Sequence, residues 1–198
     1  MKEYTKTYFL YEYSELDEEA KEKVKQDYLS ENFRNDMFQE NVLYQLKKIF
    51  PNSKLKVQYS LSSCQGDGLN IYGTLNLKDI FNLTEDNFNN KIKNKINIEK
   101  LSEFNHLETD EIKIPYNSQY CYDISDQIDF AEDEEDTNNA TKIQEWIQNL
   151  FHVLNKEFEK TGYDWFYKIS DEEMQEESES NGWTYLEDGT FFTDFGDE

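Results

Sequence analysis

The sequence predicts an α+β fold: an antiparallel sheet centred on a hairpin over residues 54–77, packed by three to four helices, with an acidic C-terminal segment. Two patterns predict it, a period-two alternation on both sides of a glycine-containing turn and apolar residues at helical spacing elsewhere. The hydrophobic fraction is only 36%, but the 198 residues include 14 Tyr and 14 Phe. Because large rings bury much area each, we expect a folded core.

The central hairpin consists of two alternating runs joined by Gly66, Asp67 and Gly68. The apolar positions of these runs are Leu55, Val57, Tyr59, Leu61, Leu69, Ile71 and Leu75. Glycine adopts positive φ without steric cost, and Asp favours tight turns. A strand follows these glycines, whereas a phosphate-binding loop would open a helix. We interpret the run as turn chemistry.

Before the hairpin, we expect a strand over residues 7–13 and two helices. Ser14 is the predicted N-cap of the first helix, which ends near Leu29. Its inner face is predicted to carry Leu16, Ala20, Val24 and Tyr28. The second helix is predicted over residues 35–50 and buries Phe38, Val42, Leu46 and Ile49.

After the hairpin, Thr84 is the predicted cap of a short helix through Phe88, Ile92 and Lys95, and strands are predicted at 112–114 and 120–124. Residues 137–160 form the clearest helical pattern, which Gly162 is expected to end. An acidic helix at 171–180 and a hairpin of 183–186 with 190–193 are expected to close the chain.

We predict an α+β domain over residues 1–168 and an acidic C-terminal extension over 169–198. Aromatic residues alternate with acids in this extension, which indicates that it packs on the same domain instead of remaining a solvated tail. These aromatic residues are Trp183, Tyr185, Phe191, Phe192 and Phe195.

The net charge of −23 is concentrated in two segments. Eight acids and no base lie between Lys113 and Lys142, and eleven acids and no base follow Lys168. The rest of the chain has 24 acids against 20 basic residues. The predicted partner-binding residues are Asp123, Asp126, Asp129, Glu132, Asp133, Glu134, Glu135, Asp136, Asp171, Glu172, Glu173, Glu176, Glu177 and Glu179. A solvated acidic face with no partner is the alternative interpretation.

The sequence offers no catalytic or metal-binding motif. His106 and His152 are the only histidines, and neither has a motif around it. Asp123, Asp126 and Asp129 lack the spacing and the glycine of a calcium loop. We therefore expect no enzyme activity, no metal site and no cofactor. The two cysteines, and the lack of a signal peptide or membrane-spanning run, predict a cytoplasmic protein with reduced thiols.

The run from Tyr59 to Gly68, YSLSSCQGDG, resembles a hairpin signature of small acidic proteins of phages and mobile elements. Residues 11–16 (YEYSEL) and 186–189 (LEDG) resemble the flanking elements of those proteins. The resemblance covers the hairpin and both ends, whereas residues 78–136 fall outside it. Some small acidic phage proteins inhibit host defence, including anti-CRISPR proteins. The resemblance implies such a role in a bacterial host cell and transfers no catalytic residue.

Two functional hypotheses follow from the charge pattern. The first is a phage inhibitor of a host defence nuclease, which occupies a basic nucleic-acid groove as an acidic mimic of nucleic acid, since duplex DNA carries about one charge per 1.7 Å of axis. Its partner would be a basic nucleic-acid-binding protein such as a CRISPR effector or restriction nuclease. The alternative is an antitoxin-like or regulatory protein–protein interaction module that binds mainly through apolar contacts. Neither hypothesis includes direct binding of nucleic acid or of a membrane.

Overall fold

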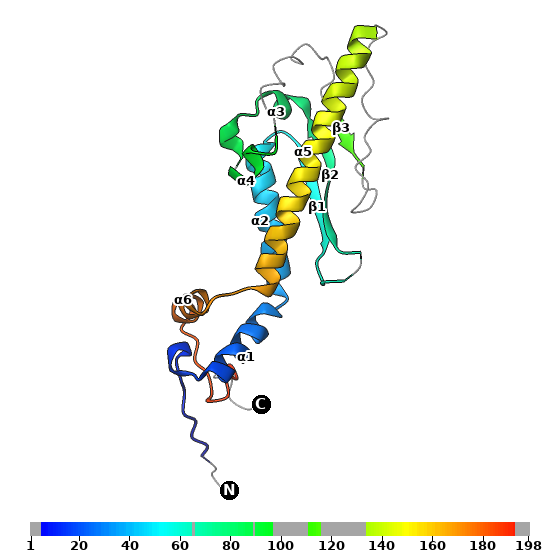
Figure 1. The fold of residues 1–198 in the computed structure, drawn as a ribbon. Helices are drawn as coiled ribbons and strands as arrows, with labels where there is room; N and C mark the ends of the chain where they lie inside the picture. The colour runs from blue at the N-terminus through cyan, green and yellow to red at the C-terminus, as the bar shows by residue number, and fades with distance from the viewer. Residues whose placement is uncertain (1–4, 65, 89, 97–110, 116–133, 193–198) are drawn as a thin grey trace, which may run out of the picture. The chain divides into compact units, whose positions relative to one another are not determined.

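The computed structural model describes residues 5–64, 66–88, 90–96, 111–115 and 134–192, without the side chains of 90, 91 and 134–140. The fold is α+β, as predicted (Figure 1). The chain divides into two compact units: unit 1 comprises residues 1–34 and 164–198, and unit 2 comprises residues 35–163. The predicted domain boundary between residues 168 and 169 stays a prediction, because compactness does not show which segments fold independently.

Unit 2 contains the predicted hairpin. Strand β1 (Lys54–Ser60) pairs antiparallel with β2 (Gly68–Asn76), in a register that places Val57 opposite Ile71. Strand β3 (Glu111–Ile114) pairs with residues 73–76 of β2, so the sheet order is β1-β2-β3. Along β1, Val57 is buried while its neighbours Lys56 and Gln58 are exposed, which confirms the predicted alternation.

Helix α5 (Glu134–Tyr167) packs against the hairpin and against α2 (Phe33–Ile49), as Figure 1 shows. The Phe151 ring stacks on Phe50 with 5.9 Å between ring centroids. The side-chain oxygen of Asn155 accepts a hydrogen bond from the Ile71 amide at 2.9 Å. Ile71 lies outside the part of β2 that pairs with β3, so Asn155 satisfies a strand amide that β3 does not reach.

The predicted end of this helix at Gly162 is wrong, because α5 continues through Gly162 to Tyr167. The glycine has a packing role instead. A Cβ atom at Gly162 would lie 2.3 Å from Leu61 Cδ1 and 2.8 Å from Phe38 Cζ. The helix therefore keeps a glycine in its interior because Phe38 of α2 and Leu61, the residue after β1, approach its backbone closely.

In α2, the four predicted inner residues, Phe38, Val42, Leu46 and Ile49, are all buried. The segment after the hairpin differs from its prediction in two ways. Helix α3 (Leu77–Phe81) begins directly after β2. Thr84 then caps a short 3-10 helix, Glu85–Asn87, and α4 (Asn90–Lys93) follows separately, so one continuous helix does not form. The strand predicted at 120–124 lies outside the described residues.

Unit 1 is built from both ends of the chain. Helix α1 (Glu18–Leu29) and the 3-10 helix Tyr13–Glu15 pack with α6 (Asp171–Asn181) and the segment after it. The shared core consists of Tyr13, Leu16, Ala20, Val24, Met174 and Tyr185. Trp183 packs against this core, whereas Phe195 lies outside the described residues.

Two predictions for the first 20 residues are wrong. Residues 7–13 do not form a strand, because only Tyr11 makes a bridge, with Tyr185. A strand needs a neighbour along its length, and in the described part of unit 1 the ladder is one residue long. The N-cap of α1 is Asp17, not Ser14, since the Asp17 carboxylate accepts a hydrogen bond from the Ala20 amide at 2.8 Å.

The predicted closing hairpin is reduced to a single bridge between Tyr185 and Phe191, with a turn at Gly189. The Gly189 φ of 78° suits this turn, and a Cβ there would lie 2.5 Å from the Ala20 carbonyl oxygen. Within the described ranges, no helix combines the length and apolar character needed to cross a membrane.

Candidate functional site

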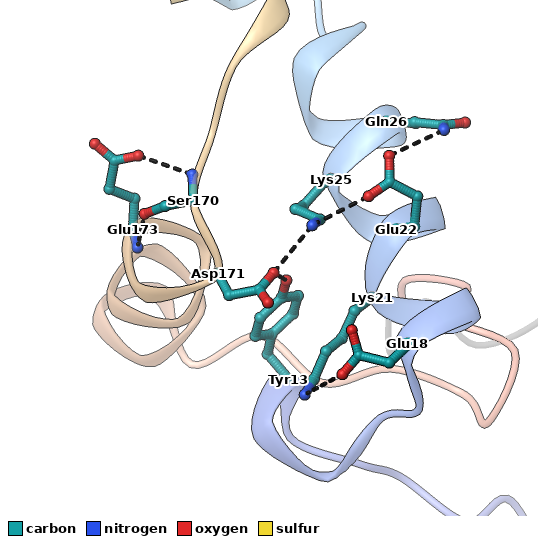
Figure 2. A network of polar contacts seen from close by, with 9 residues as sticks. All are labelled: Tyr13, Glu18, Lys21, Glu22, Lys25, Gln26, Ser170, Asp171 and Glu173. Atoms are coloured by element: carbon teal, nitrogen blue, oxygen red, sulfur yellow. Dashed lines mark hydrogen bonds and ion pairs between the residues drawn. The ribbon is translucent and has the colours of Figure 1, made fainter.

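Helix α6 carries the six predicted partner-binding residues whose side chains the structure describes: Asp171, Glu172, Glu173, Glu176, Glu177 and Glu179. The helix begins with a capping box (Figure 2). The Ser170 hydroxyl accepts from the Glu173 amide at 3.1 Å, and the Glu173 carboxylate accepts from the Ser170 amide at 2.9 Å. These bonds lower the pKa of Glu173. Glu173 therefore has a structural role. The positive N-terminal end of the helix dipole also stabilises acidic side chains in the first turn.

Asp171 is the centre of a polar network in unit 1 (Figure 2). Its carboxylate accepts from the Lys25 ammonium at 3.0 Å and from the Tyr13 hydroxyl at 2.9 Å. The hydrogen bond from Lys25, followed by that from Tyr13, lowers the pKa of Asp171. Burial, and then the bond to Asp171, raise the pKa of Tyr13. Asp171 thus connects α6 to α1 and to the 3-10 helix.

The Lys25 ammonium in this network also pairs with Glu22 at 3.1 Å (Figure 2). Its hydrogen bonds with Asp171 and then Glu22 raise the pKa of Lys25. Lys25 is therefore held in its charged form between two carboxylates, and it offsets part of the acidity of unit 1 from within.

Glu172 and Glu176 differ from the other acids of α6. Both are exposed, and neither forms a hydrogen bond or ion pair with any described residue. Glu179 accepts a hydrogen bond from Gln175 at 2.7 Å, and Glu177 from the Asn181 side-chain amide at 3.4 Å. Glu172 and Glu176 lie four residues apart on one face, where like charges cost about 0.2–0.5 kcal/mol. They are the two described α6 carboxylates without an internal structural role.

The other predicted site residues are not brought into this surface by the described structure. Asp123, Asp126, Asp129, Glu132 and Asp133 lie outside the described residues. Glu134, Glu135 and Asp136 begin α5, and their side chains are not described. The predicted role of this first acidic segment stays a prediction.

Acidic residues are denser in unit 1 than in unit 2. Unit 1 has 21 acidic and 7 basic residues in its sequence, a net charge of −14 over 69 positions. Unit 2 has 22 acidic and 13 basic residues, a net charge of −9 over 129 positions. The charge asymmetry that the sequence shows by segment is therefore also an asymmetry between two compact parts of the molecule.

Unit 1 also contains a groove that the sequence did not reveal. Its volume is about 230 Å³, and it is lined by Val24, Asp27, Tyr28, Glu31, Phe33, Met174, Trp183, Tyr185, Gly189 and Phe191. Phe33 and Phe191 are 42% and 47% exposed. One feature of the sequence pointed to such a surface, because Phe33 and Phe191 are aromatic residues that belong to no predicted apolar helix face. Their proximity in space could not be predicted, since they lie far apart in the sequence.

Asp67 stabilises the hairpin loop in unit 2 through hydrogen bonds with residues of the run 59–68 and with Tyr163. Its carboxylate accepts from the Cys64 amide at 2.9 Å, the Tyr163 hydroxyl at 3.0 Å, and the Cys64 thiol and Ser60 hydroxyl at 3.2 Å each. Desolvation alone would raise the pKa of Asp67, but these bonds together hold it well below its usual range. The loop sequence therefore has a structural explanation that needs no ligand, in agreement with its interpretation as turn chemistry.

Among the described side chains, no group of three or more His, Cys, Asp or Glu residues is placed to hold a metal ion. His152 is exposed on α5, and His106 lies outside the described residues. Comparison with protein-family models, curated proteins and solved structures gives no match for this chain. We therefore infer function from the surface chemistry of unit 1.

Proposed function

We propose that the protein is a phage or mobile-element inhibitor of a host defence nuclease, a CRISPR effector or a restriction nuclease, and that it acts inside the bacterial host cell. It binds the basic nucleic-acid groove of that enzyme as an acidic mimic and performs no catalysis. The observation that carries the proposal is the acidic surface of unit 1, where Glu172 and Glu176 are exposed on a capped, packed helix and have no internal role. Fixed charges of this kind complement a basic groove better than a solvated tail does.

The geometry of α6 supports this mimicry. Each residue advances an α-helix by about 1.5 Å, so Glu172 and Glu176 are about 6 Å apart along the axis. One strand of DNA advances about 3.4 Å per phosphate, so two steps cover about 6.8 Å. The two carboxylates therefore approximate the axial spacing of alternate phosphates on one strand.

The test begins with the full chain as bait in lysates of bacteria that carry CRISPR and restriction systems, and continues with the captured nuclease in a cleavage assay. We expect the chain to inhibit cleavage in competition with DNA, and inhibition to weaken steeply as salt rises. Glu172→Gln/Glu176→Gln should weaken inhibition, whereas the matched pair Glu40→Gln/Glu145→Gln, two exposed acids of unit 2, should not.

A four-residue variant, Glu172→Gln/Glu173→Gln/Glu176→Gln/Glu177→Gln, extends the test to the neighbouring pair of acids, Glu173 and Glu177, which are also four residues apart on α6. Gln at 173 preserves the capping box, so the helix should remain folded. Full inhibition by this variant, together with full inhibition by a variant that neutralises residues 132–136, would refute the mimic.

The groove of unit 1 favours a second candidate function, an antitoxin-like or regulatory interaction module. Its exposed aromatic rings could supply an apolar contact that does not depend on the carboxylates of α6. Salt distinguishes the two functions, because binding through apolar contacts changes little between low and moderate salt. A salt-resistant complex with a partner that has no nucleic-acid groove would favour this second function.

A further inference from the structure

We propose that the aromatic groove of unit 1 binds a short basic segment of the partner protein and takes up an Arg or Lys side chain with its apolar stem. This inference deepens the proposed function, on which it rests for the basic character of the partner. It adds a second contact, distinct from the exposed carboxylates of α6, and it defines what a partner must present there.

The size of the groove suits a side chain. Pockets for small molecules usually have volumes of about 300–1,000 Å³. The groove, at about 230 Å³, is smaller, and most of its lining is apolar or aromatic. It is therefore better matched to one long side chain of a docked peptide than to a free cofactor or metabolite.

The aromatic lining favours a cation with an apolar stem. Tyr28 lies 6.1 Å from Phe33 and 5.9 Å from Trp183, and Trp183 lies 5.7 Å from Phe191, all measured between ring centroids. The four rings form a connected series along the groove. Aromatic faces attract ammonium and guanidinium groups, while Arg and Lys stems pack on apolar surface.

The charged residues of the groove point to the same ligand class. Asp27 and Glu31 both line the groove and are exposed, and none of its described lining residues is basic. A bound cation would meet two carboxylates beside the rings, whereas an anion would be repelled by them. A second copy of the chain would present the same acidic surface, which disfavours self-association through this groove.

Unit 1 already contains an example of the proposed contact. The Arg34 guanidinium lies 4.6 Å from the Tyr28 ring centroid and 4.7 Å from the Trp165 ring centroid. Arg34 is itself buried, donates a hydrogen bond to the Trp165 carbonyl, and does not line the groove. The Tyr28 ring therefore serves as a guanidinium platform within this fold.

The test uses the full chain and two synthetic ten-residue peptides. One peptide alternates Arg and Leu, and the other replaces each Arg by citrulline, which is isosteric and uncharged. Binding is measured by calorimetry and by tryptophan fluorescence. We expect the Arg peptide to bind and the citrulline peptide to bind at least about 10-fold more weakly.

Variants locate the binding site. Phe191→Ala removes one ring, and Asp27→Asn/Glu31→Gln removes both charges with little change of shape. Each should weaken binding of the Arg peptide by about 5-fold or more. Two controls should change it by less than about 2-fold: Phe9→Ala, a 77% exposed residue that does not line the groove, and Glu40→Gln/Glu145→Gln, two exposed acids of unit 2. The Asp27/Glu31 variant keeps the test decisive if Phe191→Ala disturbs folding.

Equal affinity for both peptides, or unchanged binding of the Arg peptide by the Asp27/Glu31 variant, would overturn the inference. So would dimerisation of the pure chain that Phe191→Ala abolishes. The outcome is separable from that of the proposed function, because the peptide assay contains no nuclease. Nuclease inhibition without peptide binding refutes only the groove, and peptide binding without nuclease inhibition refutes only the nuclease as target.

Discussion

The two units are stabilised in different ways. In unit 2, the apolar face of α5 packs on strand β2, and Ile71, Leu75 and Leu150 have no exposed surface. In unit 1, a core of six residues is supplemented by polar links such as that of Asp171 with Lys25 and Tyr13. Unit 1 also leaves an aromatic groove and a row of carboxylates at its surface. We therefore propose that unit 2 serves mainly as a scaffold for the fold and that the described binding surface lies in unit 1.

The largest expected effect is a loss of stability from a truncation in the core of unit 2. Leu150→Ala should lower the free energy of unfolding by about 2–5 kcal/mol, because it removes a fully buried side chain and leaves a cavity. Urea denaturation monitored by circular dichroism measures it. Phe9→Ala in unit 1 is the control and should change stability by less than about 0.5 kcal/mol. A loss below about 1 kcal/mol for Leu150→Ala would contradict a tightly packed scaffold.

Two glycines sharpen the comparison, because one is required by packing and the other by backbone conformation. Gly162→Ala should destabilise the protein by overpacking, which costs about 1–3 kcal/mol and exceeds the helix-propensity gain of about 0.5–1 kcal/mol. Gly182, the C-cap of α6, has a φ of 66° with open space around it. Gly182→Ala should cost about 1–2 kcal/mol from conformation alone.

Asparagine distinguishes these two causes in the same unfolding assay. Gly182→Asn should recover part of the loss, since Asn tolerates the left-handed region. Gly162→Asn should recover none, because its larger side chain meets the same Phe38 and Leu61 atoms. Recovery at residue 162 would mean that overpacking is not the reason for that glycine.

Unit 1 should also respond to acid through Asp188. Hydrogen bonds from the Thr190 amide and hydroxyl, and then from Lys23, lower the pKa of Asp188 to about 2. An Asp whose folded pKa lies below its unfolded value of about 3.9 stabilises the fold above that value, and the contribution is lost as pH falls from about 4 through 2. Carbon NMR titration of the carboxyl should show the low pKa, and Thr190→Val should raise it. A wild-type midpoint near 4 would show that these bonds do not form in solution.

The smallest expected effect is on stability in the charge variant of α6. Glu172→Gln/Glu176→Gln should leave the free energy of unfolding within about 0.5 kcal/mol of wild type, with a small gain from the relief of like-charge repulsion. Thermal and urea denaturation measure this difference. A loss above about 1 kcal/mol would give these residues an unrecognised structural role and would remove the variant as a clean test of binding.

Much of unit 2 could be predicted from sequence because its signals are local. Alternation predicted the hairpin, and helical spacing predicted the buried face of α2 and most of the length of α5. The failure at Gly162 has a tertiary cause, since the contacts with Phe38 and Leu61 are distant in sequence. The same residue type that ends many helices is here required inside one.

Unit 1 was less predictable because its two ends meet only in the folded chain. The aromatic run at residues 7–13 has strand propensity, but a strand needs a neighbouring strand to pair with. The C-terminal segment pairs with this run only at Tyr11, through Tyr185. The acidic helix was predicted correctly, whereas the internal roles of Asp171 and Glu173 were not. Because Asp171 and Glu173 have these structural roles, Glu172 and Glu176 are the described α6 carboxylates whose like-charge repulsion is not offset by contacts within the protein.

The most direct test of the proposed function is the salt dependence of binding between the chain and its captured nuclease. The dissociation constant is measured at several salt concentrations for wild type, for Glu172→Gln/Glu176→Gln and for the control pair Glu40→Gln/Glu145→Gln. We predict a steep loss of affinity with salt in wild type and control, and a shallower dependence with weaker binding in the α6 variant. The same affinity and the same slope in all three proteins would contradict a binding surface made by the carboxylates of unit 1.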